Sequence, residues 1–251
     1  MGWVESSTEE GVRVLTLNRG VTNPLNAELV EELGRHFREA ADSQAITSIV
    51  ITGANEKFFS LGFDIPELVT KEPPEFEAFF RAFNLLCLDL YTLPKPTIAA
   101  LRGHTIAGGF ILASCCDYRF LSQGKKFCAL NEINLGVPVP YLSDTILRQL
   151  VGDRKATEMV YSGKLIPAEE ALKMGIVDVL LPPDQVLSES IAKARTLGIL
   201  PAEAFGAIKA NRTRSLAEAI RLRLEEDIHL FIKFWFLEEV RERLKEAMKK
   251  F

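Results

Sequence analysis

The sequence predicts an α/β protein with a parallel sheet, followed by a helical C-terminal region. Short apolar, β-branched segments alternate with longer segments of helical periodicity, and glycine stands at several turns from strand to helix. Parallel strands need crossover connections of this kind, which are usually helices. Residues 216–251 differ from the rest because they contain neither glycine nor proline. We expect that segment to be almost wholly helical.

Local signals predict the individual elements. Strands are expected at residues 12–17, 46–52, 97–101, 117–121 and 176–181. Helices are expected at residues 27–41, 76–93, 110–115, 141–151 and 154–161, and a further short helix begins at Pro167. Asn26 has a suitable side chain for the N-cap of the first helix, and Gly175 ends the short one. Pro94 stops the second helix because proline cannot continue it.

Composition is that of an ordinary globular protein and argues against several partners. Thirty basic and 34 acidic residues give a formal net charge of −4, which offers no electrostatic basis for binding nucleic acid or an anionic membrane. No segment reaches the ~20 apolar residues that span a bilayer, and residues 1–10 lack the apolar core of a signal peptide. The cysteines form no Cys-x-x-Cys pair; they are Cys87, Cys115, Cys116 and Cys128. We therefore expect buried thiols and a cytoplasmic protein.

The first candidate site is the segment Phe59-Ser60-Leu61-Gly62-Phe63-Asp64. Gly62 lets the backbone turn sharply and leaves amide N–H groups free to face a ligand. An ordinary loop glycine, with Asp64 capping the next helix, explains the same residues. From this segment alone, both interpretations stay open.

A glycine pair, Gly108-Gly109, precedes the helix expected at residues 110–115. A helix N-terminus carries unsatisfied N–H groups and a positive dipole end, which suits a developing oxyanion. Close packing of a strand against the helix would also require two glycines. The stretch does not match G-x-G-x-x-G, and no G-x-x-x-x-G-K-[ST] occurs, so a nucleotide cofactor is not indicated.

Glu132 is a lone carboxylate in a mostly apolar segment. Burial there would raise its pKa toward that of a general base, whereas a strand edge would leave it facing solvent. His36 and His229 lie on charged helical segments and are expected to be solvated, and His104 is expected to be structural. No His, Cys, Asp or Glu cluster has metal-ligand spacing, so no metal site is predicted. No G-x-S-x-G element indicates a serine hydrolase.

Taken together, four segments resemble the crotonase (enoyl-CoA hydratase/isomerase) superfamily, and the resemblance covers essentially the whole chain. These segments are residues 12–19, 59–64, 103–117 and 168–178. The resemblance implies a spiral of ββα units over residues 1–195 that binds an acyl-coenzyme A thioester. Residues 196–251 would be helices that serve oligomerisation and close the substrate tunnel. No cofactor is implied, because coenzyme A is part of the substrate.

The resemblance also assigns roles to individual residues. The backbone N–H groups of Phe63 and Gly108 would form an oxyanion hole for the thioester carbonyl, with Glu132 as the catalytic acid–base. Residues expected near coenzyme A and the reacting thioester are Lys57, Ser60, Leu61, Gly62, Asp64 and Ile65. On the terminal helix, the best matches to the residues near the acyl tunnel are Phe231, Lys233 and Phe234.

One position departs from the hydratases of this family. Hydratases carry a first catalytic glutamate just after the glycines, where this chain has Ile111, and a second at the position of Glu132. The run Leu130-Asn131-Glu132 and the run 227–234 are similar to mitochondrial-type Δ3-Δ2-enoyl-CoA isomerases. The resemblance therefore implies an isomerase of fatty acid metabolism. It would convert 3-enoyl-CoA to 2-enoyl-CoA through a dienolate, with one glutamate as its acid–base and Ile111 beside the substrate.

Two alternatives stay open: another crotonase reaction, hydration above all, or a weakly catalytic paralogue that binds acyl-CoA. The resemblance implies a homotrimer or a dimer of trimers. Apolar residues cover nearly all faces of the helix around residues 231–237, which must therefore be buried by something. A membrane-surface role is not favoured, because residues 225–227 are acidic and lipid-surface helices are usually basic.

Overall fold

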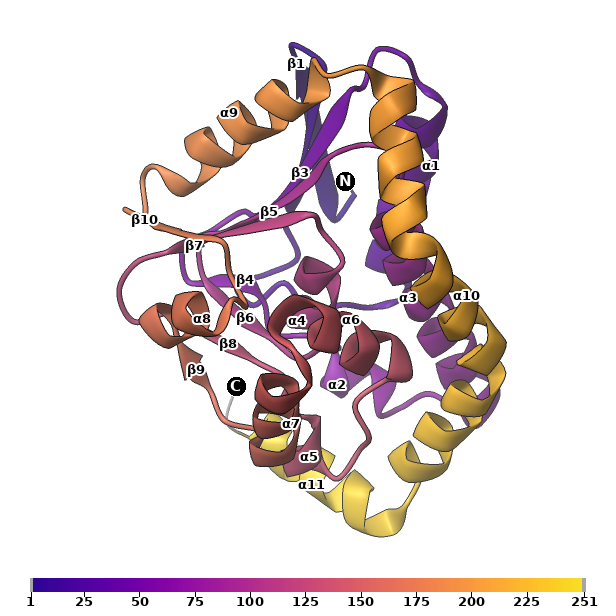
Figure 1. Cartoon of the computed structure of the whole chain (residues 1–251). Helices are drawn as coiled ribbons and strands as arrows, with labels where there is room; N and C mark the ends of the chain where they lie inside the picture. The colour runs from indigo at the N-terminus through magenta and orange to yellow at the C-terminus, as the bar shows by residue number, and fades with distance from the viewer. Residues whose placement is uncertain (1, 250–251) are drawn as a thin grey trace.

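The structure, a computed structural model, describes residues 2–249 and confirms the mixed α/β class (Figure 1). The larger sheet has six strands: β1 (Val4–Glu9), β2 (Val12–Leu17), β3 (Ser48–Gly53), β5 (Thr97–Leu101), β7 (Tyr118–Ser122) and β10 (Val179–Leu181). Their order across the sheet is β1-β2-β3-β5-β7-β10. β1 is antiparallel to β2, and all other neighbours are parallel.

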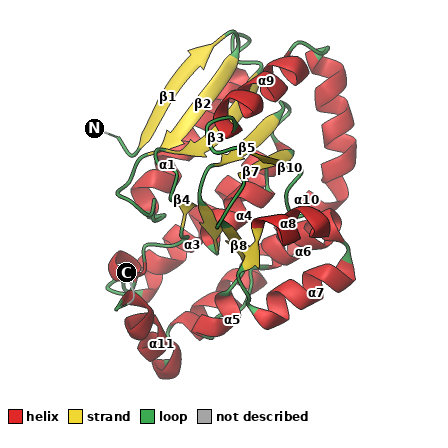
Figure 2. Cartoon of the chain, turned by 90° about the vertical axis from the view of Figure 1, so that its left-hand side faces the viewer, coloured by secondary structure: helices red, strands yellow, loops and turns green. Residues whose placement is uncertain are grey.

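A smaller sheet lies beside the first. Its strands are β4 (Phe58–Ser60), β6 (His104–Ile106), β8 (Phe127–Ala129) and β9 (Ile166–Pro167), in the order β4-β6-β8-β9. The first three are parallel, and β9 is antiparallel to β8. Figure 2 shows the two sheets with helices packed around them.

From β3 to β8, successive strands alternate between the two sheets, and helices complete each repeat. β3 and β4 are followed by α2 (Ile65–Leu68) and α3 (Pro73–Thr92), β5 and β6 by α4 (Gly108–Ser114), and β7 and β8 by α5 (Glu132–Leu135). This is the spiral of ββα units that the family resemblance implied. Every residue of β3 and β5 is buried, as expected for parallel strands covered on both faces.

The remaining helices cover the sheets. They are α1 (Ala27–Asp42), α6 (Tyr141–Val151), α7 (Asp153–Ser162), α8 (Ala168–Met174) and α9 (Val186–Gly198). Asn26 caps α1 as predicted, because its Oδ1 accepts the Leu29 N–H at 3.1 Å. α9 packs on β3 and β5, so the boundary expected between residues 195 and 196 falls inside this helix.

The C-terminal region is helical, with a turn that the sequence did not predict. It consists of α10 (Ala202–Trp235) and α11 (Glu238–Met248). α10 begins well before residue 216 and includes Gly206, which packs against Pro94. Between Trp235 and Glu238 the chain turns, so that α11 contacts α5 and α2. The turn buries Val240 and Leu244 almost completely, whereas a straight continuation would carry them away from these helices.

β1 was also not predicted from the sequence. Only Val4 of this strand is buried and the rest is exposed, so it lacks the apolar alternation that marks a half-buried strand. Backbone pairing with β2 defines it instead. Within residues 2–249, no helix combines the length and the apolar character needed to cross a membrane.

Candidate active site

A cavity of about 330 Å³ opens between the start of α4, the residues before α2, α5 and the end of α10. This volume is typical of small-molecule sites. Its walls are mainly apolar, and the polar side chains in them are Thr22, Asp64, Asn131 and Glu132. The cavity can therefore hold an apolar group beside two carboxylates.

The first wall is the backbone around Phe63, which a neighbouring loop fixes on both sides. The Leu25 N–H donates to the Gly62 carbonyl at 2.8 Å, and the Asp64 N–H donates to the Leu25 carbonyl at 2.9 Å. The Phe63 ring packs edge-on against two phenylalanines of α3, with centroids 4.9 Å apart in each pair. The Phe63 N–H has no acceptor in the described part of the chain. The backbone around Phe63 is therefore fixed, while its N–H group is free to donate to a ligand.

The second wall begins at Ala107, which directs the Gly108 amide. Ala107 has φ 48° and ψ −124°, a left-handed conformation that residues other than glycine seldom adopt. Its N–H donates to the Ala129 carbonyl at 2.8 Å. Such a backbone costs about 1–3 kcal/mol and is typical of functional sites. As the first residue of α4, Gly108 has no intrahelical acceptor for its N–H, and residues 2–249 supply no other.

These two stretches of backbone touch. A Cβ on Gly62 would lie 2.8 Å from the Gly108 nitrogen, and a Cβ on Gly108 would lie 3.0 Å from the Phe63 ring. Gly62 also has φ 93°, so only glycine fits there without strain. Two unpaired amides therefore lie side by side on the cavity wall, an arrangement able to stabilise an oxyanion.

The second glycine of the pair serves packing instead. A Cβ on Gly109 would lie 2.5 Å from the Ser60 carbonyl oxygen, so α4 can approach β4 only because this position is glycine. The packing interpretation of the glycine pair is thus confirmed for Gly109, and the oxyanion interpretation of Gly108 stays a prediction.

Glu132 begins α5 and is 5% exposed, so the solvent-facing alternative is excluded. Its Oε2 is buried, and no hydrogen-bond donor among the described residues contacts it. Burial raises the pKa of Glu132 to about 7. A carboxylate with this pKa can both accept and return a proton near neutral pH.

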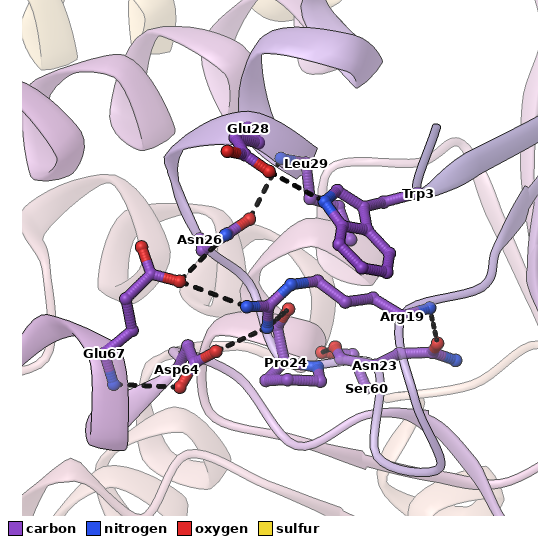
Figure 3. Close-up of polar contacts among 10 residues, drawn as sticks. All are labelled: Trp3, Arg19, Asn23, Pro24, Asn26, Glu28, Leu29, Ser60, Asp64 and Glu67. Carbon is purple, nitrogen blue, oxygen red and sulfur yellow. Dashed lines mark hydrogen bonds and ion pairs between the residues drawn. The ribbon is translucent and has the colours of Figure 1, made fainter. Parts of the chain in front are cut away.

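Asp64, the other carboxylate of the cavity wall, is fully engaged (Figure 3). It forms an ion pair with Arg19, and its Oδ1 accepts the Glu67 N–H at 3.1 Å, which caps α2. The capping role considered from the sequence is confirmed. Of the two carboxylates, only Glu132 has no charged partner in the part of the chain that the structure describes.

Several residues predicted from the sequence lie at the cavity. Leu61, Ile65, Ile111 and Phe231 line it. Ser60 lies behind the wall, and its Oγ accepts the N–H of the following glycine, residue 62, at 3.1 Å. Ile111 is 2% exposed and places no acid in the cavity.

Five predicted substrate-binding residues do not line the cavity: Ser60 and Gly62, which adjoin the lining residue Leu61, and Lys57, Lys233 and Phe234. Lys57 is exposed, with its ammonium group 5.4 Å from the centre of the Phe58 ring. Lys233 is exposed as well, and Phe234 is half-buried against the hydrophobic core. Contact of the Lys57, Lys233 and Phe234 side chains with a larger ligand stays a prediction.

Trp235, Ala247 and Met248 also line the cavity and were missed. Trp235 lies one helical turn after Phe231, so helical periodicity could have identified it. No such signal exists for Ala247 and Met248, because they reach the cavity only through the turn before α11.

The histidines are structural or peripheral. The His104 ring stacks on Phe127, with centroids 5.4 Å apart, and its Nδ1 accepts the Phe127 N–H at 3.2 Å. His229 is exposed, as expected. The expectation for His36 was wrong: its side chain is only 18% exposed, lies beside Arg13, and burial lowers its pKa.

We predict that the free energy of unfolding of Glu132→Gln, relative to that of wild type, increases with pH. Burial raises the pKa of folded Glu132 to about 7 from an ordinary 4.5, so between these values only the folded state holds the proton. Wild-type stability therefore falls as pH rises through this window and levels off above it. At ~1.36 kcal/mol per pKa unit, the advantage of the amide should increase by about 2–3 kcal/mol from pH 5 to pH 8.

Urea unfolding at the two pH values measures this difference. Glu242→Gln, at an exposed position, is the control and should shift stability equally at both. An equal shift for Glu132→Gln as well would contradict the raised pKa.

Comparisons of sequence point to one family. Residues 7–251 match the family described as Enoyl-CoA hydratase/isomerase. The chain is 28% identical to "Enoyl-CoA delta isomerase 1, mitochondrial" of Homo sapiens, over 97% of this chain and 83% of that protein. It is 32% identical to "Probable enoyl-CoA hydratase echA17" of Mycolicibacterium paratuberculosis, over 88% of this chain and 86% of that protein.

Comparisons of structure agree. The crystal structure of human mitochondrial delta3-delta2-enoyl-CoA isomerase superimposes with a TM-score of 0.95 at 26% identity, covering 99% of this chain and 97% of the other. Enoyl-CoA hydratase from Bacillus halodurans gives a TM-score of 0.90 at 22% identity, covering 98% and 100%, which shows a shared fold. The family match spans nearly the whole chain and confirms the resemblance seen in the sequence. This chain belongs to the enoyl-CoA hydratase/isomerase family of enzymes, within the crotonase superfamily.

Proposed function

We propose that this enzyme is an isomerase that converts 3-enoyl-CoA to 2-enoyl-CoA, with Glu132 as its only acid–base group. One observation carries the proposal: among residues 2–249, the cavity holds a single carboxylate without a charged partner, and Ile111 stands where a first acid would be. The similarity to human enoyl-CoA isomerase supports the same choice.

One carboxylate is enough for this reaction. The double bond shifts when a proton leaves C2 and a proton is added at C4, and a single base can remove the first and return it at the second. Glu132, whose pKa burial raises to about 7, accepts the proton as a carboxylate and donates it as an acid. No change of oxidation state occurs, and coenzyme A enters as part of the substrate.

The intermediate is a dienolate, whose negative charge lies largely on the thioester oxygen. The Phe63 and Gly108 N–H groups would donate to that oxygen, each contributing on the order of 3–4 kcal/mol. The mainly apolar walls would lower the local dielectric constant and so strengthen these hydrogen bonds. Lys57 and the segment 60–65 would lie along coenzyme A, with Phe231, Lys233 and Phe234 along the acyl tunnel.

Hydration is the main alternative, since hydratases are also among the relatives. In this family, hydration divides water activation and carbon protonation between two carboxylates. Here Asp64 is engaged by Arg19 and Ile111 supplies no acid, which favours isomerisation. Loss of conjugation when 2-enoyl-CoA is added would favour hydration. Tight acyl-CoA binding without turnover would favour a non-catalytic paralogue.

We predict that Glu132→Gln lowers kcat by about 10²–10⁴-fold, near the upper end, because one group performs both proton transfers. KM should change little, since the proton is moved mainly in the transition state. Isomerisation of 3-enoyl-CoA, followed by the absorbance of the conjugated product, measures both. Glu242→Gln should behave as wild type. If Glu132→Gln kept more than about a tenth of wild-type kcat, the assignment would fail, and Asp64 would be tested next.

We predict that Ile111→Glu adds measurable hydration of 2-enoyl-CoA, because it restores a second acid at the cavity wall. Isomerisation should fall only moderately, since Glu132 remains. Ile111→Gln has a similar size and no acid, so it should add no hydration. A folded Ile111→Glu protein without hydratase activity would mean that access of water, and not the missing acid, is limiting.

We also propose a homotrimer or a dimer of trimers in the cytoplasm. Ile208 and Leu222 of α10 are 61% and 86% exposed, and other copies of the chain would cover these two apolar side chains. Light scattering at micromolar concentration should give at least three times the chain mass, and a monomer would contradict the assembly.

The four cysteines are buried and free, which supports a reducing compartment.

A further inference from the structure

Arg19 connects three segments beside the cavity (Figure 3). Its Nη1 forms an ion pair with Asp64 and also donates to the Pro24 carbonyl at 3.2 Å, and its Nη2 lies 3.1 Å from Glu67 Oε2. The Arg19 side chain is only 16% exposed. This contact is therefore screened by water much less than an exposed ion pair.

Other contacts keep the guanidinium in this position. The Trp3 ring lies 5.4 Å from the Arg19 Cζ, a cation–π arrangement. Asn26 Nδ2 donates to Glu67 Oε2 at 2.9 Å, the same oxygen that Arg19 contacts. Asp64 uses Oδ2 for Arg19 and Oδ1 for the N-terminus of α2. Each carboxylate of the cluster and both terminal nitrogens of Arg19 thus have a partner, while the buried Arg19 Nε has none among the described residues.

This cluster is one peptide unit away from the Phe63 amide. Asp64 follows Phe63 directly, and its own N–H is bonded to Leu25. Movement of Asp64 would therefore turn the backbone that aims the Phe63 N–H. The Asp64 carboxylate also borders the cavity, where an unpaired negative charge would oppose the charge of an enolate oxygen.

We propose that Arg19 is a positioning residue for the oxyanion hole. It anchors the Asp64 carboxylate and neutralises its charge, so that the Phe63 N–H stays aimed and the dienolate meets no opposing charge. Arg19 does not itself line the cavity, and it acts through Asp64. This inference rests on the proposed enolate chemistry and adds a residue to it.

The test compares four proteins: wild type, Arg19→Gln, Asp64→Asn and the double variant. Two readouts are used: isomerisation of 3-enoyl-CoA, and exchange of the C2 protons of a saturated acyl-CoA with D₂O, followed by NMR. Exchange needs only a base and an oxyanion hole. Arg81→Gln is the matched control, because it removes the exposed Arg81–Glu225 ion pair between α3 and α10; it should leave both rates unchanged.

Arg19→Gln should lower kcat and the exchange rate by about 10–100-fold, the range for a misaligned catalytic group, with little change in KM. Adding Asp64→Asn should recover most of the loss, because asparagine still caps α2 and carries no charge. A purely structural role for Arg19 would give no such recovery. Wild-type rates in Arg19→Gln, or a double variant no better than Arg19→Gln, would overturn the proposal.

Two further results distinguish a failure of the proposed function from a failure of the role proposed for Arg19. A wild type that exchanges C2 protons without isomerising 3-enoyl-CoA would refute the proposed function, while the exchange rates still test Arg19; a wild type that does neither would overturn both. Should Arg19→Gln fail to fold, Arg19→Lys carries the test. Its single ammonium keeps the charge but lacks the planar fork whose two nitrogens contact the two carboxylates, so kcat should fall with KM preserved, and an unchanged kcat would overturn the proposal.

Discussion

The parallel pairing of β4, β6 and β8 is the constraint on which the site depends. Phe58 pairs with His104, and Thr105 pairs with Cys128. Because parallel strands end at the same edge of a sheet, the segments that follow them leave side by side. The two amides follow β4 and β6, and Glu132 follows β8. Three very short strands thus place two unpaired N–H groups and one buried carboxylate around a single cavity.

The two carboxylates of that cavity have opposite environments. Asp64 forms an ion pair with the Arg19 guanidinium and accepts an N–H of the first turn of α2, so its charge is balanced and its position fixed. Glu132 begins a helix itself and has no charged partner among the described residues, and burial raises its pKa to about 7. Identical chemical groups therefore suit different tasks, one for holding the backbone and the other for moving a proton. Arg19 is the charged partner that Asp64 has and Glu132 lacks among the described residues.

Local signals predicted the elements that depend on local chemistry. The Asn26 cap located the start of α1, and the bounds expected for β5 and α6 agree with the structure. Elements decided by distant contacts were missed: β1 is defined by pairing, and the turn before α11 by the burial of Val240 and Leu244.

The candidate site, like the fold, could be predicted from the sequence only in part. The residue patterns alone left Gly62 and Glu132 open, and the family resemblance was needed to connect them. Arg19 stayed unassigned because its partner Asp64 lies 45 residues further along the chain. Polar clusters built across such separations leave no periodic pattern in a sequence, since each member looks like an ordinary surface charge.

The stacking of α10 on α3 bears on how the enzyme is made. Phe76 stacks on Trp235 and Phe80 on Phe231, with ring centroids 4.3 and 4.1 Å apart. Trp235, Phe231 and Met248 line the candidate active-site cavity. Chains emerge from the ribosome N-terminus first. Phe76 and Phe80 of α3 are therefore synthesised long before Phe231 and Trp235 of α10, on which they stack. During that time they form an exposed apolar surface, on which a chaperone or another nascent chain can bind. The candidate active-site cavity is complete only when residue 248 has emerged.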